Sequence, residues 1–271
     1  MGNNKKENQK LKEQRLGKEN YNNQGCLMKI IEYNSATNIV VEFQDKYKTR
    51  VLTRYSYFEI GQIDNPCFPS VYGHGMIGNE YCSRADTKEY KAWDRMLERC
   101  YSEKLLNRRP TYKNVTCCDE WLYYPNFYEW LHSQENFDKW LNDEKWAIDK
   151  DILIKGNKVY SPETCCLVPN RVNMLFTKSD SKRGVYPIGV AFKKGKKTNQ
   201  FRAAISKIDK RTGKKKFEHI GYRSTPEKAF LLYKKEKELY IKQVAQEEYD
   251  KGNITKKCYD AMMNYEVEIT D

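Results

Sequence analysis

The segment over residues 146–176, WAIDKDILIKGNKVYSPETCCLVPNRVNMLF, constrains the fold of this chain more than any other. Apolar runs flank Gly156, and they predict a strand over 147–155 and a short return strand over 158–160. Gly156 and Asn157 suit the turn between these strands, because glycine adopts a positive φ at no steric cost. The segment therefore predicts a β-hairpin.

The residues after the hairpin predict a helix, which completes a strand–strand–helix unit. Ser161 is a typical N-cap, and Pro162 suits the first helical position. Asp149 and Asp151 lie on the first predicted strand, and a unit of this kind has the shape of a nuclease site that uses one metal ion. The oxygens of Asp149, Asp151 and Asn157 suit Mg²⁺, with Mn²⁺ as the alternative. Zinc is not expected, because the chain has no Cys-x-x-Cys motif.

Positive charge is concentrated in one part of the chain. The formal net charge is +12, and residues 178–223 hold 15 Lys and Arg against 3 Asp and Glu, which leaves 34 basic and 34 acidic residues elsewhere. Such a concentration indicates a polyanionic partner, most often nucleic acid, because each phosphate contact releases condensed counterions. A solvated basic surface without a ligand is the alternative. The candidates for contact with double-stranded DNA are Lys193, Lys194, Arg202, Lys207, Arg211, Lys214, Lys215, Lys216 and Arg223.

Hydrophobic periodicity predicts an α+β chain. Strands are predicted over 27–33, 38–43 and 49–55 and, in the basic part, over 188–193, 200–208 and 216–222. Helical spacing predicts helices over 89–101, 125–131 and 225–249. The predicted parts are a flexible basic arm or frayed helix over 1–22, a small β-rich module with a linker over 23–80, a ββα domain with supporting helices over 85–177, a basic three-stranded antiparallel sheet packed on one helix over 183–250, and a tail over 251–271. The tail is expected to hold a further short helix followed by acidic residues.

The composition argues against a membrane or secreted protein. No apolar run approaches the roughly 20 residues that a membrane helix needs. The first residues, MGNNKKENQKLKEQRLGKEN, lack the apolar core of a signal peptide. The nine cysteines are an odd number and include two adjacent pairs, which favours reduced thiols over disulfides. We therefore expect a cytoplasmic protein without a membrane partner, and the sequence leaves its oligomeric state open.

Several spaced motifs resemble two known families. YKAWDRMLERCY, VTCCDEWLYYPNFYEWL and AIDKDILIKGNKVYSPETC follow one another as in HNH-like phage proteins and closely resemble them. Downstream, GVYPIGVAFKK, FRAAISK and HIGYRSTPEKAFLLY resemble the ethylene-response-factor type of DNA-binding domain, in which a three-stranded sheet enters the major groove and one helix packs behind it. The combination resembles phage-encoded homing-type endonucleases. On such a sheet we expect arginines to read guanine edges and lysines to contact phosphates.

The HNH resemblance assigns roles residue by residue. An HNH nuclease uses a histidine as general base, an adjacent aspartate that binds one divalent metal ion, and an asparagine that orients the base. The aspartate matches Asp149, whereas Lys150 stands at the base position and Thr164 at the asparagine position. Lys150 could act as a base only if burial lowered its pKa by several units. The catalytic candidates are Asp149, Lys150, Asp151 and Asn157, with Asp149 and Asp151 as the metal ligands.

Two functions stay open on this resemblance. The chain is either an endonuclease that nicks or cleaves DNA with a divalent metal ion, or a catalytically degenerate binder. The binder would act as a DNA-binding regulator, or as a phage counter-defence protein that inhibits a host nuclease or another defence protein. The replacement of the expected histidine and asparagine by Lys150 and Thr164 motivates the second reading.

Overall fold

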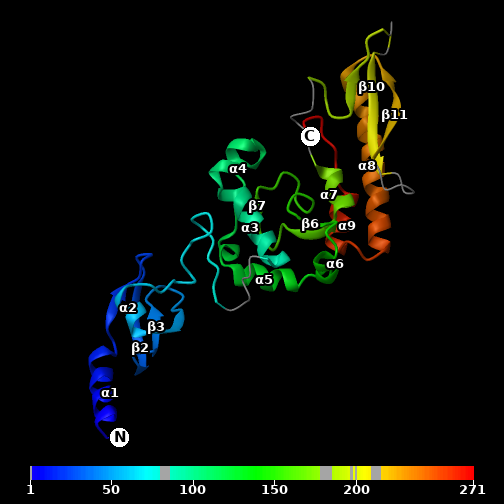
Figure 1. Ribbon diagram of the computed structural model, residues 1–271. Helices are drawn as coiled ribbons and strands as arrows, with labels where there is room; N and C mark the ends of the chain where they lie inside the picture. Colours follow the sequence, from blue (N-terminus) through cyan, green and yellow to red (C-terminus); the bar gives the residue numbers. More distant parts are fainter. Residues whose placement is uncertain (1, 80–85, 178–184, 196–197, 199, 209–214) are drawn as a thin grey trace. The chain divides into compact units, whose positions relative to one another are not determined.

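The computed structural model describes residues 2–79, 86–177, 185–195, 198, 200–208 and 215–271 (Figure 1). They fall into two compact units, Met1–Trp130 and Leu131–Asp271. Helices and an antiparallel sheet occur in each unit, which confirms the predicted α+β class. Arg211 and Lys214, two of the residues predicted to contact DNA, lie outside the described residues. In the described part of the chain, no helix has the length and apolar character needed to cross a membrane.

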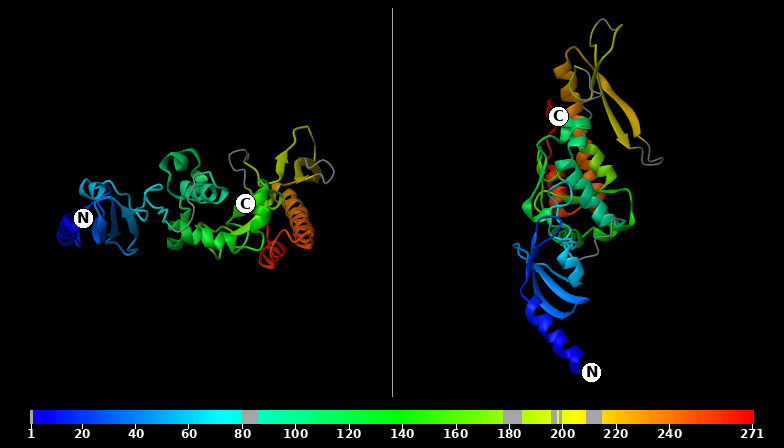
Figure 2. Two further views of the ribbon diagram at one scale, coloured as in Figure 1. Left: turned by 60° about the horizontal axis from the view of Figure 1, so that its bottom comes forward. Right: turned by 60° about the vertical axis from the view of Figure 1, so that its left-hand side comes forward.

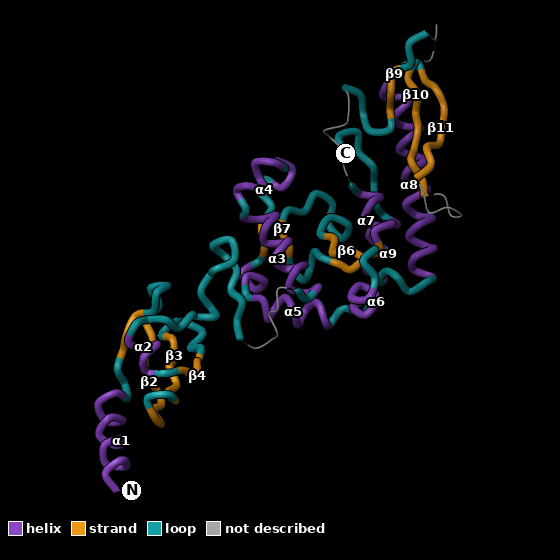
Figure 3. Tube along the Cα trace, in the orientation of Figure 1, coloured by secondary structure: helices purple, strands orange, loops and turns teal. Residues whose placement is uncertain are grey.

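The first unit opens with a helix and a four-stranded antiparallel sheet (Figure 3). Its elements are α1 (Gly2–Arg15), β1 (Glu19–Tyr21), β2 (Leu27–Ser35), β3 (Asn38–Phe43), β4 (Arg50–Thr53) and α2 (Tyr55–Glu59), and the strand order is β1-β2-β3-β4. The strands predicted over 27–33, 38–43 and 49–55 are confirmed. Their alternating apolar residues build a separate core that includes Met28, Ile30, Ile39, Val41 and Phe43.

The predicted arm over 1–22 begins with the helix α1, and its later residues join the sheet. Glu19–Tyr21 pairs with β2 as an edge strand. Arg15, the last residue of α1, places its guanidinium 3.7 Å from the ring centre of Tyr55 and donates a hydrogen bond to the Tyr33 hydroxyl at 2.9 Å. These contacts join polar side chains to the module, and polar composition alone gave no sign of them.

The rest of the first unit is helical and rich in aromatic residues. Its elements are α3 (Lys88–Tyr101), α4 (Glu103–Arg108), the 3-10 helix η1 (Pro110–Tyr112), β5 (Thr116–Cys117), the 3-10 helix η2 (Asp119–Leu122) and α5 (Tyr124–His132). The helices predicted over 89–101 and 125–131 are confirmed. Thr87 caps α3 by accepting the N–H of Tyr90. The buried indole of Trp93 donates to the carbonyl of Trp121 at 2.7 Å, which fixes α3 against η2.

The second unit contains two paired strands followed by a helix. The elements of this part are α6 (Phe137–Asn142), β6 (Trp146–Asp149), β7 (Val159–Tyr160), β8 (Cys166–Pro169) and α7 (Asn170–Phe176). β6 pairs antiparallel with β8, from Trp146 opposite Pro169 to Asp149 opposite Cys166. A ββα unit is therefore present, but its second strand is β8.

The predicted hairpin within 147–160 is wrong. The first strand ends at Asp149, because the Asp149 carboxylate accepts the backbone N–H groups of Asp151 and Ile152 and turns the chain. Gly156 occupies a turn with φ +76°, as predicted. The partner of β6 comes from later in the sequence, so the local turn signal did not reveal the pairing.

The predicted helix start at Ser161 is also wrong. Residues 162–164 form a turn, in which the N–H of Thr164 bonds to the Ser161 carbonyl at 3.2 Å. The chain then continues as β8, and the helix begins only at Asn170. Ser161 and Pro162 are equally typical of turns and of helix starts, and strand pairing decides between them here.

The basic part forms the predicted sheet and helix. β9 (Val190–Phe192), β10 (Phe201–Ile208) and β11 (Lys215–Arg223) form an antiparallel sheet in the order β11-β10-β9, and α8 (Pro226–Asp250) runs along one face (Figure 2). Thr225 caps α8 by accepting the N–H of Lys228. The three strands and the helix predicted for 183–250 are thus confirmed.

The ββα unit and the basic sheet share one hydrophobic core. Its buried members include Ile152, Val168, Val172, Ala203, Ile205, Tyr233, Ile241 and Val244. The tail over 251–271 holds a short helix, as predicted, and this helix, α9 (Lys256–Met263), buries Cys258 and Met262 in the same core. Val267 follows them into it. Apolar residues four positions apart form one face of a short helix, and α8 covers that face.

Candidate nucleic-acid interface and the Asp149 loop

Asp149 stabilises the loop that follows β6. Its side chain is buried, with 8% of the residue exposed, and Oδ1 accepts hydrogen bonds from the N–H groups of Asp151 at 2.7 Å and Ile152 at 2.9 Å. Burial raises the pKa of Asp149, and the two backbone hydrogen bonds offset only part of that rise. The carboxylate therefore acts as the acceptor for a turn.

Lys150 forms internal contacts as well. Its ammonium group is buried and donates to the Asp151 carboxylate at 2.6 Å and to the Asn157 carbonyl at 3.0 Å. The same nitrogen lies 5.8 Å from the ring centre of Tyr160. A cation in an ion pair offers no lone pair to a water proton, so this geometry does not support Lys150 as a general base.

Asn157 and Thr164 complete the loop through hydrogen bonds to the backbone. The Asn157 amide donates to the carbonyls of Lys150 at 2.9 Å and Val159 at 2.7 Å, and its oxygen accepts the Val159 N–H. The Thr164 hydroxyl donates to the Val159 carbonyl at 2.8 Å and accepts the N–H of Ser161. The hydrogen bonds of both polar side chains therefore stabilise the conformation of the loop.

A divalent metal ion fits this loop poorly. The ammonium group of Lys150 already lies against the carboxylate of Asp151, and one oxygen of Asp149 is bound to two N–H groups. Among the described residues, no cluster of three or more His, Cys, Asp or Glu side chains could hold an ion. The structure brings Asp149, Lys150, Asp151 and Asn157 together. Their hydrogen bonds stabilise the loop and do not form a set of metal ligands.

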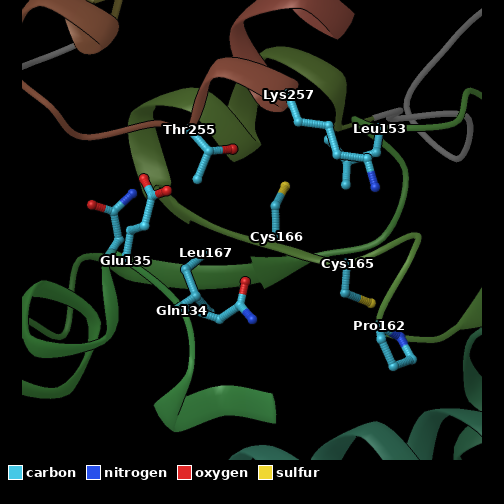
Figure 4. Close-up of a pocket in the computed structure, with 10 residues that line it drawn as sticks. Gln134, Glu135, Leu153, Pro162, Cys165, Cys166, Leu167, Thr255 and Lys257 are labelled. Carbon is cyan, nitrogen blue, oxygen red and sulfur yellow. The ribbon is translucent and has the colours of Figure 1, made fainter.

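A small cavity beside β8 provides no alternative nucleophile. It has a volume of about 240 Å³ and is lined by residues that include Leu153, Cys165, Cys166 and Lys257 (Figure 4). Burial raises the pKa of Cys165 to about 12, and a hydrogen bond with Cys258 together with burial raises that of Cys166. Both groups are therefore neutral thiols at neutral pH, which are poor nucleophiles. The Lys257 amine donates to the Glu163 carbonyl at 2.7 Å.

Lys207, one of the predicted DNA contacts, lies on the face of the basic sheet that packs on α8 and forms ion pairs within the protein. Ala203 and Ile205 are buried there, and Lys207 continues the same alternation. Its ammonium group pairs with Glu236 of α8 at 2.6 Å and with Glu218 of β11 at 3.1 Å, and these contacts raise the pKa of Lys207. Lys207 is therefore a poor candidate for phosphate binding.

The opposite face of the sheet presents an arginine and aromatic side chains. The guanidinium carbon of Arg202 lies 5.4 Å from the ring centre of Phe217, which is 64% exposed. The rings of His219 and Tyr222 lie 4.6 Å apart. Stacking on an aromatic ring restricts a guanidinium and fixes the direction of its donors.

The remaining predicted contacts lie at the ends of the strands, with Lys215 on the same face as Phe217 and Lys216 on the face of Lys207. Lys193 and Lys194 follow β9, Lys215 and Lys216 begin β11, and Arg223 ends it, and all of them are exposed. Within the described ranges, none of these side chains forms an ion pair with an acidic residue. Arg223 donates to the neighbouring carbonyl of Tyr222. These cations are available to a ligand.

The aromatic members of this face were not among the predicted contacts. Phe217, His219 and Tyr222 were overlooked because charge was the only criterion for choosing residues there. The signal was present in KKFEHIGYR, where Phe217 and His219 are two positions apart and so share one face of a strand.

Comparison with known proteins adds no assignment. No family model, curated protein or solved structure matches this chain. The HNH-like and ethylene-response-factor resemblances therefore stay predictions.

Proposed function

We propose that this protein binds double-stranded DNA through the outer face of β9, β10 and β11. The observation that carries the proposal is Arg202 lying over the ring of Phe217, with exposed basic side chains at the ends of the same strands that form no ion pair with an acidic residue in the described part of the chain. Arginine donates two hydrogen bonds to the edge of guanine, and lysines neutralise phosphates. A β-ribbon fits the major groove of B-DNA, so this face is suited to a duplex.

The ββα unit serves this function as a support. The side chains of Asp149 and Asn157 are hydrogen-bonded to the backbone of the loop and Lys150 pairs with Asp151, which leaves them little capacity for cleavage. With the motif resemblances, we infer a phage DNA-binding protein of HNH homing-endonuclease ancestry that acts as a regulator in the host cytoplasm.

A salt titration of duplex binding tests the interface. The full chain is titrated against a fluorescent duplex at several salt concentrations, and the slope of log K against log salt is compared for two double variants. Lys215→Gln/Lys216→Gln is expected to reduce the slope by about 2, because each lost phosphate contact removes about one unit. Lys104→Gln/Lys113→Gln, at exposed sites of the first unit, is the matched control and should leave it unchanged. A slope that both variants leave equal to that of the parent would count against the interface.

A plasmid assay separates binding from cleavage. Supercoiled plasmid incubated with the protein and Mg²⁺ or Mn²⁺ is expected to stay intact, since the Asp149 loop is occupied by its own contacts. Nicking that disappears in Asp149→Ala would show that the endonuclease reading is right and that the loop rearranges on DNA.

A further inference from the structure

Helix α8 carries an exposed stripe that the sheet does not use. Lys228, Leu231, Lys235, Leu239 and Lys242 follow one another at intervals of three or four residues, which places them on one face of a helix. All five are exposed, and Leu231 and Leu239 are 62% and 54% exposed. The opposite face of α8 buries Ala229, Tyr233, Tyr240 and Val244. The stripe therefore faces away from the core.

The stripe borders a shallow hollow on the surface. The hollow has a volume of about 280 Å³ and is lined by Leu231, Lys234, Lys235, Glu238, Leu239 and Lys242. Two leucines eight positions apart on a helix lie about 12 Å from each other along its axis. This distance corresponds to two turns of a facing helix, whose apolar residues would fill the same hollow.

Part of the charge along this hollow is already neutralised. Lys234 pairs with Glu238 at 3.2 Å and donates to the Val267 carbonyl at 2.9 Å, and Glu238 accepts the Val267 N–H at 2.9 Å. Lys228, Lys235 and Lys242, by contrast, form no ion pair with an acidic residue in the part of the chain that the structure describes. The stripe thus presents three lysines that have no ion-pair partner among the described residues, with two leucines between them.

We propose that this stripe binds an acidic amphipathic helix of a partner protein. Leucine side chains gain nothing from a phosphate backbone, whereas they gain from burial against apolar residues of a protein helix. The lysines favour glutamates or aspartates at matching spacing on that helix. A second copy docked through the same stripe would bring the three lysines of each chain together, which like-charge repulsion opposes. This inference is independent of the proposed DNA contact, which uses the opposite side of the α8–sheet layer.

Synthetic peptides test the stripe in the full chain. The probe is an amphipathic helix with leucines on one face and glutamates flanking them, and the matched control has lysines in place of the glutamates. We expect the acidic peptide to bind and the basic peptide not to bind. Leu231→Ser/Leu239→Ser should weaken binding about tenfold, as loss of central apolar anchors does. Lys235→Glu/Lys242→Glu should reverse the preference in favour of the basic peptide.

The controls make the proposal falsifiable. All four substituted residues are exposed, so circular dichroism and thermal melts should match those of the parent protein. Lys215→Gln/Lys216→Gln, on the sheet, should leave peptide binding unchanged. Equal peptide affinity in the parent and in both α8 variants would refute the proposal. It would also fail if Lys235→Gln/Lys242→Gln weakened duplex binding as much as the sheet variant does, or if Leu231→Ser/Leu239→Ser abolished self-association seen by sedimentation.

Discussion

The Asp149 loop and the outer face of the basic sheet were both predicted as functional sites, and they differ in what their polar groups contact. In the loop, the side chains of Asp149, Lys150 and Asn157 are hydrogen-bonded to the surrounding backbone, and Lys150 also pairs with the Asp151 carboxylate. On the sheet, Lys215 and Lys216 point to solvent without an acidic partner in the described ranges. A polar or charged residue type therefore indicates a binding site only when its side chain is not already hydrogen-bonded or ion-paired within the protein.

The largest expected effect is on the stability of the loop. Asp149→Ala removes a buried acceptor of two N–H groups and should lower the free energy of unfolding by about 2 kcal/mol. Asp149→Asn keeps an acceptor oxygen and loses only a charge that burial disfavours, so we expect a change below about 1 kcal/mol. Urea denaturation of both variants measures the difference. Equal losses in the two would mean that the charge of Asp149, and not its acceptor oxygen, is what the fold needs.

A smaller effect should separate two lysines of the same sheet. Lys207→Gln removes the ion pairs with Glu218 and Glu236 and should cost about 0.5 kcal/mol of stability. It should leave the salt dependence of duplex binding unchanged. Lys215→Gln, on the outer face, should do the reverse, with unchanged stability and a salt slope reduced by about 1. If Lys207→Gln flattened the slope as much, the division between internal and available cations would be wrong.

The smallest expected effect is a pH dependence of loop stability. Burial raises the pKa of Asp149 in the folded state above its usual value of 3.8. The folded state therefore binds the proton more tightly than the unfolded state does. The resulting stabilisation is fully present below pH 3.8 and is lost as the pH rises through the folded pKa. Relative to Asp149→Asn, the parent should thus lose stability on going from acid to neutral pH, which urea titrations across that range would detect. A constant difference between the two proteins would contradict the raised pKa.

Local sequence signals were sufficient where local contacts decide the structure. The strand alternation in 27–43 and the Thr225-Pro226-Glu227 start of α8 predicted elements that the structure contains. The hairpin failed because β6 pairs with 166–169, beyond the turn at Gly156. A turn signal describes the residues around it and carries no information about a strand that arrives later.

The sequence could predict which residue types form a candidate site, but not which of these side chains are free of contacts within the protein. Asp149, Lys150, Asp151 and Asn157 lie close together because they belong to the end of β6 and the loop that follows it. The sequence could not show that Lys207 meets Glu236, because that contact joins residues 29 positions apart across a strand and a helix. The partner of a charged side chain is fixed by packing, and packing depends on the whole unit.

The shared core gives the ββα unit a role that catalysis does not explain. Ile152, Val168 and Val172 lie in the same cluster as Ile241 and Val244 of α8, the helix that supports the basic sheet. Deleting the ββα unit would expose the apolar face of α8 to water, and the helix that supports the sheet would be destabilised. The ββα unit is therefore needed to keep α8 and the basic sheet folded, whether or not it has a chemistry of its own.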